Sequence, residues 1–133
     1  MGRAKGPPMT MKKRDASRRL RLLSGWGHAC VLCGRGFATI DCVTFEHLVP
    51  RSMGGRRRHN IGPSHHVCNS LRGTASLLEG AARVEAALCE LAVRWGTGGV
   101  ERFLATPVPH RLVPERQAKR FAMQARSLRG GSR

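Results

Sequence analysis

Residues 30–73 read CVLCGRGFATIDCVTFEHLVPRSMGGRRRHNIGPSHHVCNSLRG and hold four of the five cysteines and four of the six histidines of the chain. Two pairs in this stretch share one spacing, with two residues between the members: Cys30 with Cys33, and His65 with Cys68. This spacing lets both side chains of a pair reach a metal ion from a single turn. Three thiolates and one imidazole make a closed tetrahedral zinc site with no position for water. The pattern therefore predicts a structural zinc ion.

These cysteines also allow other interpretations. His66 could replace His65 as the fourth ligand, but only His65 repeats the two-residue spacing to Cys68. A Cys-x-x-Cys pair can be redox-active, but no thioredoxin-like β-α-β pattern surrounds this one. Cys42 and Cys89 lie outside the pattern, and we expect both to be small buried apolar residues.

The length and composition of the chain predict one small domain whose core needs additional stabilisation. The sequence has 133 residues, with four Phe, two Trp and no Tyr. So few aromatic side chains make a small core, which a structural metal commonly supports. No apolar run has the length of a membrane-spanning helix, and no apolar segment follows the basic first residues. We therefore expect a cytoplasmic protein with reduced thiols and no membrane partner.

The formal net charge of +16 is the strongest signal in the composition. Basic residues are concentrated near both ends of the chain, and such a field attracts polyphosphate. Cationic ends can also be solvated linkers or bind an acidic protein, but this much excess charge favours nucleic acid as the partner.

The pattern of apolar and turn residues divides the chain into three segments. Residues 1–24 are expected to form a basic arm and a short helix over 12–23. Residues 25–74 form the core, with short antiparallel strands over 42–45 and 61–64 and a helical turn or two over 65–72. Residues 75–133 form a helical extension with a basic tail: a long helix over 75–95, a further turn over 100–104 and a last basic helix over 115–128.

The long helix over 75–95 carries one apolar stripe with helical spacing, which we expect to pack against the core. The stripe consists of Leu77, Ala81, Val84, Leu88, Leu91 and Trp95. A seam between two copies of the chain is the alternative.

Between the two zinc-binding pairs, further residues occur in a characteristic order. Glu46-His47 is followed by Pro50 and a Gly-Gly loop, then by Asn60-Ile61, Cys68-Asn69 and Arg72-Gly73. In residue types, order and spacing this stretch resembles the HNH endonucleases, in particular the zinc-stapled subgroup common in phage and bacterial genomes. The resemblance covers residues 30–73, about a third of the chain.

The resemblance implies a ββα-metal core in which two strands and a helix surround a catalytic cation. By this resemblance His47 is the general base that takes a proton from the attacking water, since imidazole exchanges protons near neutral pH. Asn60 would brace the loop and orient His47. Glu46 and Asn69 would hold a divalent cation, Mg²⁺ or Mn²⁺, through oxygen. The residues assigned to the DNA backbone are Arg51, Arg56, Arg57, Arg58 and Arg72.

The sequence departs from the family pattern at three of these positions. Glu46 stands where Asp is usual, Asn69 where His is often found, and His65 where a zinc-binding cysteine is usual. Each replacement keeps a donor atom, although the first two are expected to weaken binding of the catalytic cation.

These observations predict a small α+β protein: an HNH ββα-metal core with a structural zinc knuckle, flanked by helices and basic tails. The expected activity is metal-dependent hydrolysis of DNA, preferably double-stranded, in a bacterium or a phage-infected host. The alternatives are a catalytically inert zinc-stapled DNA-binding module and an accessory subunit of a larger phage DNA-packaging or repair machine. Such a subunit would dock through the apolar stripe over 77–95.

Overall fold

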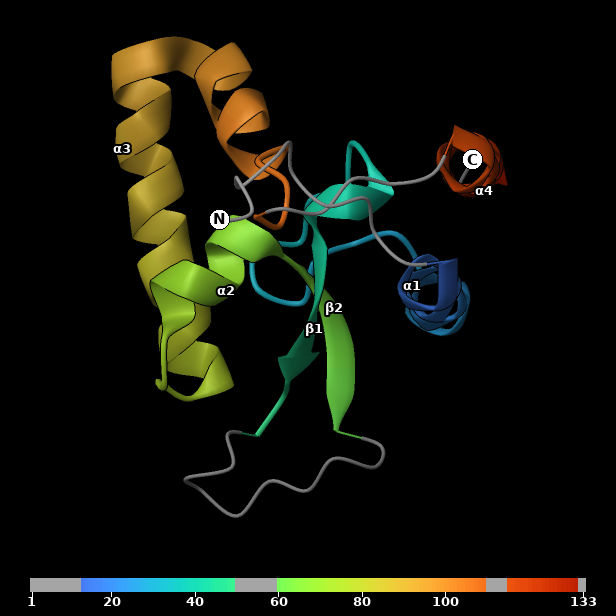
Figure 1. Cartoon of the computed structure of the whole chain (residues 1–133). Coiled ribbons are helices and arrows are strands. Elements are labelled where there is room, and N and C mark those ends of the chain that lie inside the picture. The colour runs from blue at the N-terminus through green and yellow to red at the C-terminus, as the bar shows by residue number, and fades with distance from the viewer. Residues whose placement is uncertain (1–12, 50–59, 110–114, 132–133) are drawn as a thin grey trace, which may run out of the picture.

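The structure is a computed structural model that describes residues 13–49, 60–109 and 115–131. Seven elements follow one another along the chain (Figure 1): α1 (Lys13–Trp26), the short 3₁₀ helix η1 (Ile40–Cys42), β1 (Val43–His47), β2 (Ile61–His65), α2 (His66–Arg72), α3 (Leu77–Leu104) and α4 (Glu115–Gly131). This arrangement confirms the predicted small α+β fold with a ββα unit. The predicted arm over 1–11 and most of the arginine-rich loop lie outside the described residues.

The two strands form an antiparallel hairpin in which Val43 pairs with His65 and His47 pairs with Ile61. β1 has the sequence VTFEH, in which β-branched and aromatic residues favour an extended backbone. β2 has the sequence IGPSH, which is a poor strand former, so its conformation depends on pairing. Pro63 is tolerated because each strand of a two-stranded sheet has a free edge. The carbonyl of Pro63 accepts a hydrogen bond from the Val31 amide at 2.9 Å, which ties the first cysteine loop to β2.

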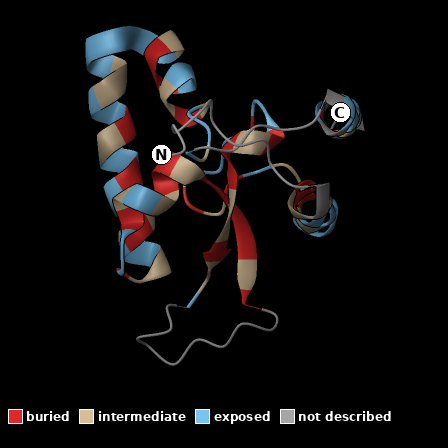
Figure 2. Ribbon diagram, in the orientation of Figure 1, coloured by how far each residue is buried: buried red, intermediate tan, exposed pale blue. Residues whose placement is uncertain are grey.

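Helices cover both sides of the hairpin. α1 packs against β1 and β2 on one side, with α4 next to α1, whereas α2 and α3 lie together on the other side (Figure 1). Buried residues are concentrated in the strands, in α2 and on the inner face of α3 (Figure 2). The core cluster draws on every helix of the described chain and includes Leu23, Ile40, Val67, Val84 and Phe121.

α1 extends three residues beyond its predicted end at residue 23. The helical hydrogen bonding continues to Gly27, whose amide donates to the Leu23 carbonyl at 2.6 Å. Ser24 and Gly25 therefore lie within the last turn of the helix rather than ending it. A glycine inside a helix costs only about 1 kcal/mol relative to alanine, which packing of the apolar face can offset.

α3 joins the predicted long helix and the predicted further turn into one element with a kink at Gly96. There φ is 71° and ψ is −176°, a left-handed φ that favours glycine. Before the kink, Val84 and Leu88 are buried in the core cluster, so the prediction that the stripe packs against the core is confirmed. Trp95 is the exception, with 65% of its surface exposed. The kink turns the chain there, and Val100 and Leu104 are the next residues to be buried.

The two cysteines outside the zinc pattern behave differently. Cys42 is fully buried, as predicted, and its thiol donates to the Thr39 carbonyl at 2.9 Å. Burial raises the pKa of this thiol. Cys89 is exposed, so the prediction for it is wrong. It follows the buried Leu88 on α3, and one residue turns about 100° around a helix, away from the core.

Among the described residues, none of the helices combines the length and the apolarity required to span a membrane.

Candidate metal centre and active site

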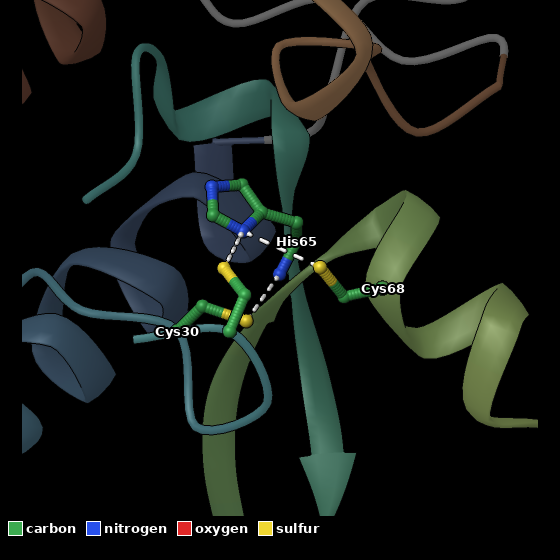
Figure 3. Close-up of side chains that lie close together, drawn as sticks. Cys30, His65 and Cys68 are labelled. Carbon is green, nitrogen blue, oxygen red and sulfur yellow. Dashed lines mark hydrogen bonds between the residues drawn. The ribbon is translucent and has the colours of Figure 1, made fainter. Parts of the chain in front are cut away.

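The four predicted zinc ligands come together in one cluster. The ligand atoms of Cys30, Cys33, His65 and Cys68 all lie within 4.8 Å of one another. The Nδ1 atom of His65 lies 3.4 Å from the sulfur of Cys33 and 3.7 Å from the sulfur of Cys68 (Figure 3). Ordinary zinc bond lengths and tetrahedral angles place such a nitrogen and sulfur about 3.6 Å apart. The cluster therefore fits a structural zinc ion.

Backbone amides around the cluster point at the sulfur atoms. The amides of Leu32 and His65 both donate to the sulfur of Cys30 at 3.4 Å, and the amide of Arg35 donates to the sulfur of Cys33 at the same distance. The Cys30 amide itself donates to the Arg35 carbonyl at 2.9 Å, which closes the tight loop. These contacts place partial positive charge around the sulfur atoms and so stabilise the thiolate form that binds metal.

The second ring nitrogen of His65 fixes which nitrogen faces the sulfurs. Nε2 lies 2.9 Å from the carbonyl oxygen of Gly36, which can only accept a hydrogen bond. Nε2 therefore carries the proton and donates, and Nδ1 keeps the lone pair that a metal requires. His66 is not part of the cluster, so the choice of His65 over His66 agrees with the geometry.

The electrostatics of the cluster favour a negative sulfur at Cys30 and a positive partner beside it. Hydrogen bonds from Cys33 and Cys68 lower the pKa of the Cys30 thiol, and hydrogen bonds with Cys30 and Cys33 raise the pKa of the Cys68 thiol. Burial alone lowers the pKa of His65, but its hydrogen bonds with Cys30 and Cys33 and their charge raise that pKa to about 9. A divalent cation would supply the positive charge that the sulfurs attract.

Two further predicted ligands lie close together where β1 faces α2. Glu46 is buried on β1, and Asn69 projects from α2. The Asn69 amide lies 3.2 and 3.0 Å from the two carboxylate oxygens of Glu46 and donates to them when its nitrogen faces the carboxylate. Burial raises the pKa of the Glu46 carboxyl, and the nearby charge of Arg72 acts in the opposite direction.

Arg72 occupies the interior of this site rather than its surface. Only 1% of its surface is exposed, and its Nη1 lies 3.3 Å from Glu46 Oε1. Its Nη1 and Nη2 donate to the carbonyls of His47 and Leu48 at 2.6 and 3.0 Å, and its Nε donates to the Ala75 carbonyl at 2.8 Å. The guanidinium thus binds groups within the protein and is enclosed, which does not fit the expected contact with a DNA phosphate.

The position of Arg72 also depends on the start of α3. A Cβ atom at Gly80 would lie 2.4 Å from Cγ of Arg72, so only glycine allows the two helices to approach this closely.

The sequence did contain a signal for the role of Arg72. It follows Asn69 by three residues on a helix, which places both on the face that meets Glu46.

His47 follows Glu46 on β1, so its side chain leaves the opposite face of the strand. Its Nε2 is buried and has no hydrogen-bond partner among the described residues. Within the same residues, no hydrogen bond joins its ring to Glu46 or Asn69. The structure thus brings the two predicted ligands, Glu46 and Asn69, into contact, whereas His47 is fixed beside them through its backbone carbonyl.

Asn60 holds the base of the hairpin loop. Its Oδ1 accepts from the Val49 amide at 2.9 Å, and its Nδ2 donates to the Val49 carbonyl at 2.8 Å. Its carbonyl also accepts from the Leu48 amide at 2.9 Å. These bonds fix the two residues that follow His47. The residues assigned to the DNA backbone in this loop lie outside the described part of the chain: Arg51, Arg56, Arg57 and Arg58.

Comparison with the known protein families found no match, and a search of curated proteins found no similar sequence. The ββα unit and its cluster of three cysteines and one histidine are compatible with a zinc-stapled, HNH-like fold.

Proposed function

We propose that the protein is a metal-dependent HNH endonuclease that hydrolyses phosphodiester bonds of double-stranded DNA. One observation carries the proposal: Glu46 and Asn69, which each have an oxygen that a cation can bind, contact each other between β1 and α2 beside the strand end that bears His47. The net charge of +16 supports a polyanionic substrate.

The donor chemistry of this pair fits a hard divalent cation such as Mg²⁺ or Mn²⁺. Carboxylate and amide oxygens are the ligands that such ions prefer. A half-turn of the Asn69 amide would present its oxygen in place of its nitrogen, beside the Glu46 carboxylate. Arg72 now neutralises that carboxylate and would share it with the cation. When bound, such a cation polarises the phosphate and stabilises charge on the leaving oxygen.

His47 would act as the general base. Its buried Nε2, which has no partner among the described residues, can accept a proton from a water molecule. That water attacks phosphorus, the bond to the 3′ oxygen breaks, and the 3′ oxygen takes a proton from solvent water. The products then carry a 5′-phosphate and a 3′-hydroxyl. Arg72 and Asn60 hold the backbone of residues 47–49 and thereby keep the imidazole in place.

Cleavage of supercoiled plasmid DNA with Mg²⁺ or Mn²⁺ tests the proposal. His47→Ala should lower the rate at least about 100-fold, because the general base is lost. His66→Ala changes a histidine outside both groups of ligands and should cut at the wild-type rate. Zinc content and circular dichroism confirm that each variant is folded. Equal cutting by His47→Ala and wild type would exclude His47 as the base.

A catalytically inert DNA-binding module is the second candidate, and a specific observation favours it. Arg72 and Asn69 together already pair with the carboxylate of Glu46. The carboxylate would therefore gain less free energy from binding a cation. Such a module would bind DNA in a salt-sensitive manner and cut with neither metal.

A docking role on a larger packaging or repair machine stays a prediction. The stripe assigned to it packs largely within the protein, since Val84 and Leu88 are buried and Trp95 is its one exposed member among the described residues.

A further inference from the structure

A groove of about 340 Å³ lies between α1 and α4. These two helices lie on the side of the hairpin away from α3 (Figure 1). Six residues line this α1–α4 groove: Ser17, Leu20, Arg21, Ser24, Arg120 and Gln124. Leu20 is the only apolar residue among them, and the others offer guanidinium, hydroxyl and amide donors. This lining suits an anion rather than an apolar ligand.

The two groove arginines are available for a ligand. Arg21 and Arg120 are exposed, and neither forms an ion pair within the described part of the chain. Further exposed basic residues flank the groove on the same two helices: Arg18, Arg116, Lys119 and Arg126. The groove therefore lies in the middle of a concentrated positive field.

Charge on α3, which lies on the other side of the hairpin, is nearly balanced. α3 carries four of the eight acidic residues of the chain, at positions 79, 85, 90 and 101, beside three arginines at 83, 94 and 102. The excess positive charge of the described helices is thus concentrated on α1 and α4. A polyanion would approach that side first.

Both groove helices are anchored to the core, which fixes the spacing of the arginines. On α4, Phe121 is buried, and its ring lies 4.9 Å from that of His28. On α1, Leu20 and Leu23 are buried in the core cluster. Donors held on a rigid scaffold lose less conformational freedom on binding than donors on mobile loops.

We propose that the α1–α4 groove binds the sugar-phosphate backbone of duplex DNA outside the site of cleavage. Arg21 and Arg120 would contact phosphates through their guanidinium groups, and Ser17 and Ser24 would donate hydrogen bonds. The contact carries no base readout, so it holds and orients DNA of any sequence. The inference deepens the proposed function, since it assigns DNA to a surface remote from Glu46 and Asn69.

Binding of a fluorescent duplex, measured over a series of salt concentrations without divalent cation, tests this groove. Arg21→Ala/Arg120→Ala should reduce the slope of log affinity against log salt by about 2, because each phosphate contact contributes about 0.9. Arg94→Ala/Arg102→Ala removes the same charge from α3 and should leave the slope unchanged. Arg21→Lys/Arg120→Lys keeps the charge and should retain most of the slope.

Several outcomes would overturn the inference. An equal loss in the groove and α3 variants would show that net charge, not the groove, governs binding. An unchanged slope in a folded groove variant would show that Arg21 and Arg120 do not contact phosphates. Loss of binding to phosphatidylserine vesicles with unchanged duplex binding would assign the groove to a membrane surface instead.

His47→Ala separates this inference from the proposed function. It should bind the duplex with the wild-type slope and fail to cut it. If the groove variant loses binding while His47→Ala cuts normally, the catalytic proposal fails and the groove stands. If His47→Ala abolishes cleavage while the groove variant binds normally, the groove fails and the catalytic proposal stands.

Discussion

A single buried side chain, that of Arg72, connects β1, α2 and the start of α3. Its guanidinium neutralises Glu46 and satisfies backbone carbonyls at His47, Leu48 and Ala75. Removing one member of a buried ion pair leaves the other charge in a medium of low dielectric constant, which is strongly destabilising. Arg72 therefore contributes to stability and to the position of His47 together.

The effect of Arg72 on stability can be measured by urea denaturation in the presence of zinc. Arg72→Met should lower the free energy of unfolding by about 3–5 kcal/mol, because the Glu46 carboxylate loses its cation. Arg94→Met removes an arginine whose pair with Glu90 is exposed and should change stability by no more than about 0.5 kcal/mol. Adding Glu46→Leu to Arg72→Met should recover part of the loss. Equal effects of the Arg72 and Arg94 variants would contradict this account.

At the scale of a secondary-structure element, the start of α3 matters because it places Gly80 against Arg72. A capping box defines this start: the Ser76 hydroxyl accepts from the Glu79 amide at 3.2 Å, and the Glu79 carboxylate accepts from the Ser76 amide at 3.3 Å. Both bonds satisfy amides that have no partner within the helix. The cap therefore helps to fix the register between α3 and α2.

Ser76→Ala should lower the free energy of unfolding by about 1 kcal/mol at neutral pH, the usual cost of losing an N-cap. The Glu79 contribution should depend on pH, since hydrogen bonds from Ser76 lower the pKa of the Glu79 carboxyl in the folded state. A lowered folded pKa means that the stabilisation is present above the unfolded pKa and is lost as pH falls through the folded value.

Denaturation of wild type and Glu79→Gln at several pH values checks this dependence. Their difference in stability should be largest near neutral pH and should shrink on acidification below the ordinary pKa of glutamate. Protonation of the zinc ligands is common to both proteins and cancels in the comparison. Glu85→Gln, further along the same helix, serves as the control. A difference that grows on acidification would reverse the assigned sign.

At the scale of the whole molecule, the zinc cluster joins parts of the chain that lie about thirty positions apart in the sequence. It links the loop of Cys30 and Cys33 to β2 and α2, in a protein whose core contains few aromatic residues. Binding of structural zinc contributes on the order of 10 kcal/mol, as much as the whole stability of a typical domain. The folded state should therefore depend on zinc.

Cys68→Ser should lose zinc and unfold, whereas Cys89→Ser should retain a stoichiometric amount of zinc because Cys89 is exposed and outside the cluster. Metal analysis and far-UV circular dichroism of the two purified variants give the comparison. Chelation of zinc from the wild type should have the same effect as Cys68→Ser. A Cys68→Ser protein that remains folded and binds zinc normally would remove that residue from the ligand set.

Spacing along the chain determined the features that depend on short-range geometry. The two pairs with two intervening residues identified the zinc ligands, because residues three positions apart lie on one side of a turn. The apolar period identified the long helix, and the β-branched run of β1 identified the first strand. Glu46 and Asn69 were named through the resemblance, and they do lie together.

Tertiary structure alone decided which side chains are buried and what they contact. Arg72 carries the charge of a surface residue, yet it is enclosed because Gly80 lets α3 pack over it. Trp95 and Cys89 have the character of core residues, yet the kink at Gly96 and the rotation of α3 leave both exposed. The groove between α1 and α4 joins residues about a hundred positions apart. Burial depends on contacts between distant segments, whereas local spacing reports only on neighbours along the chain.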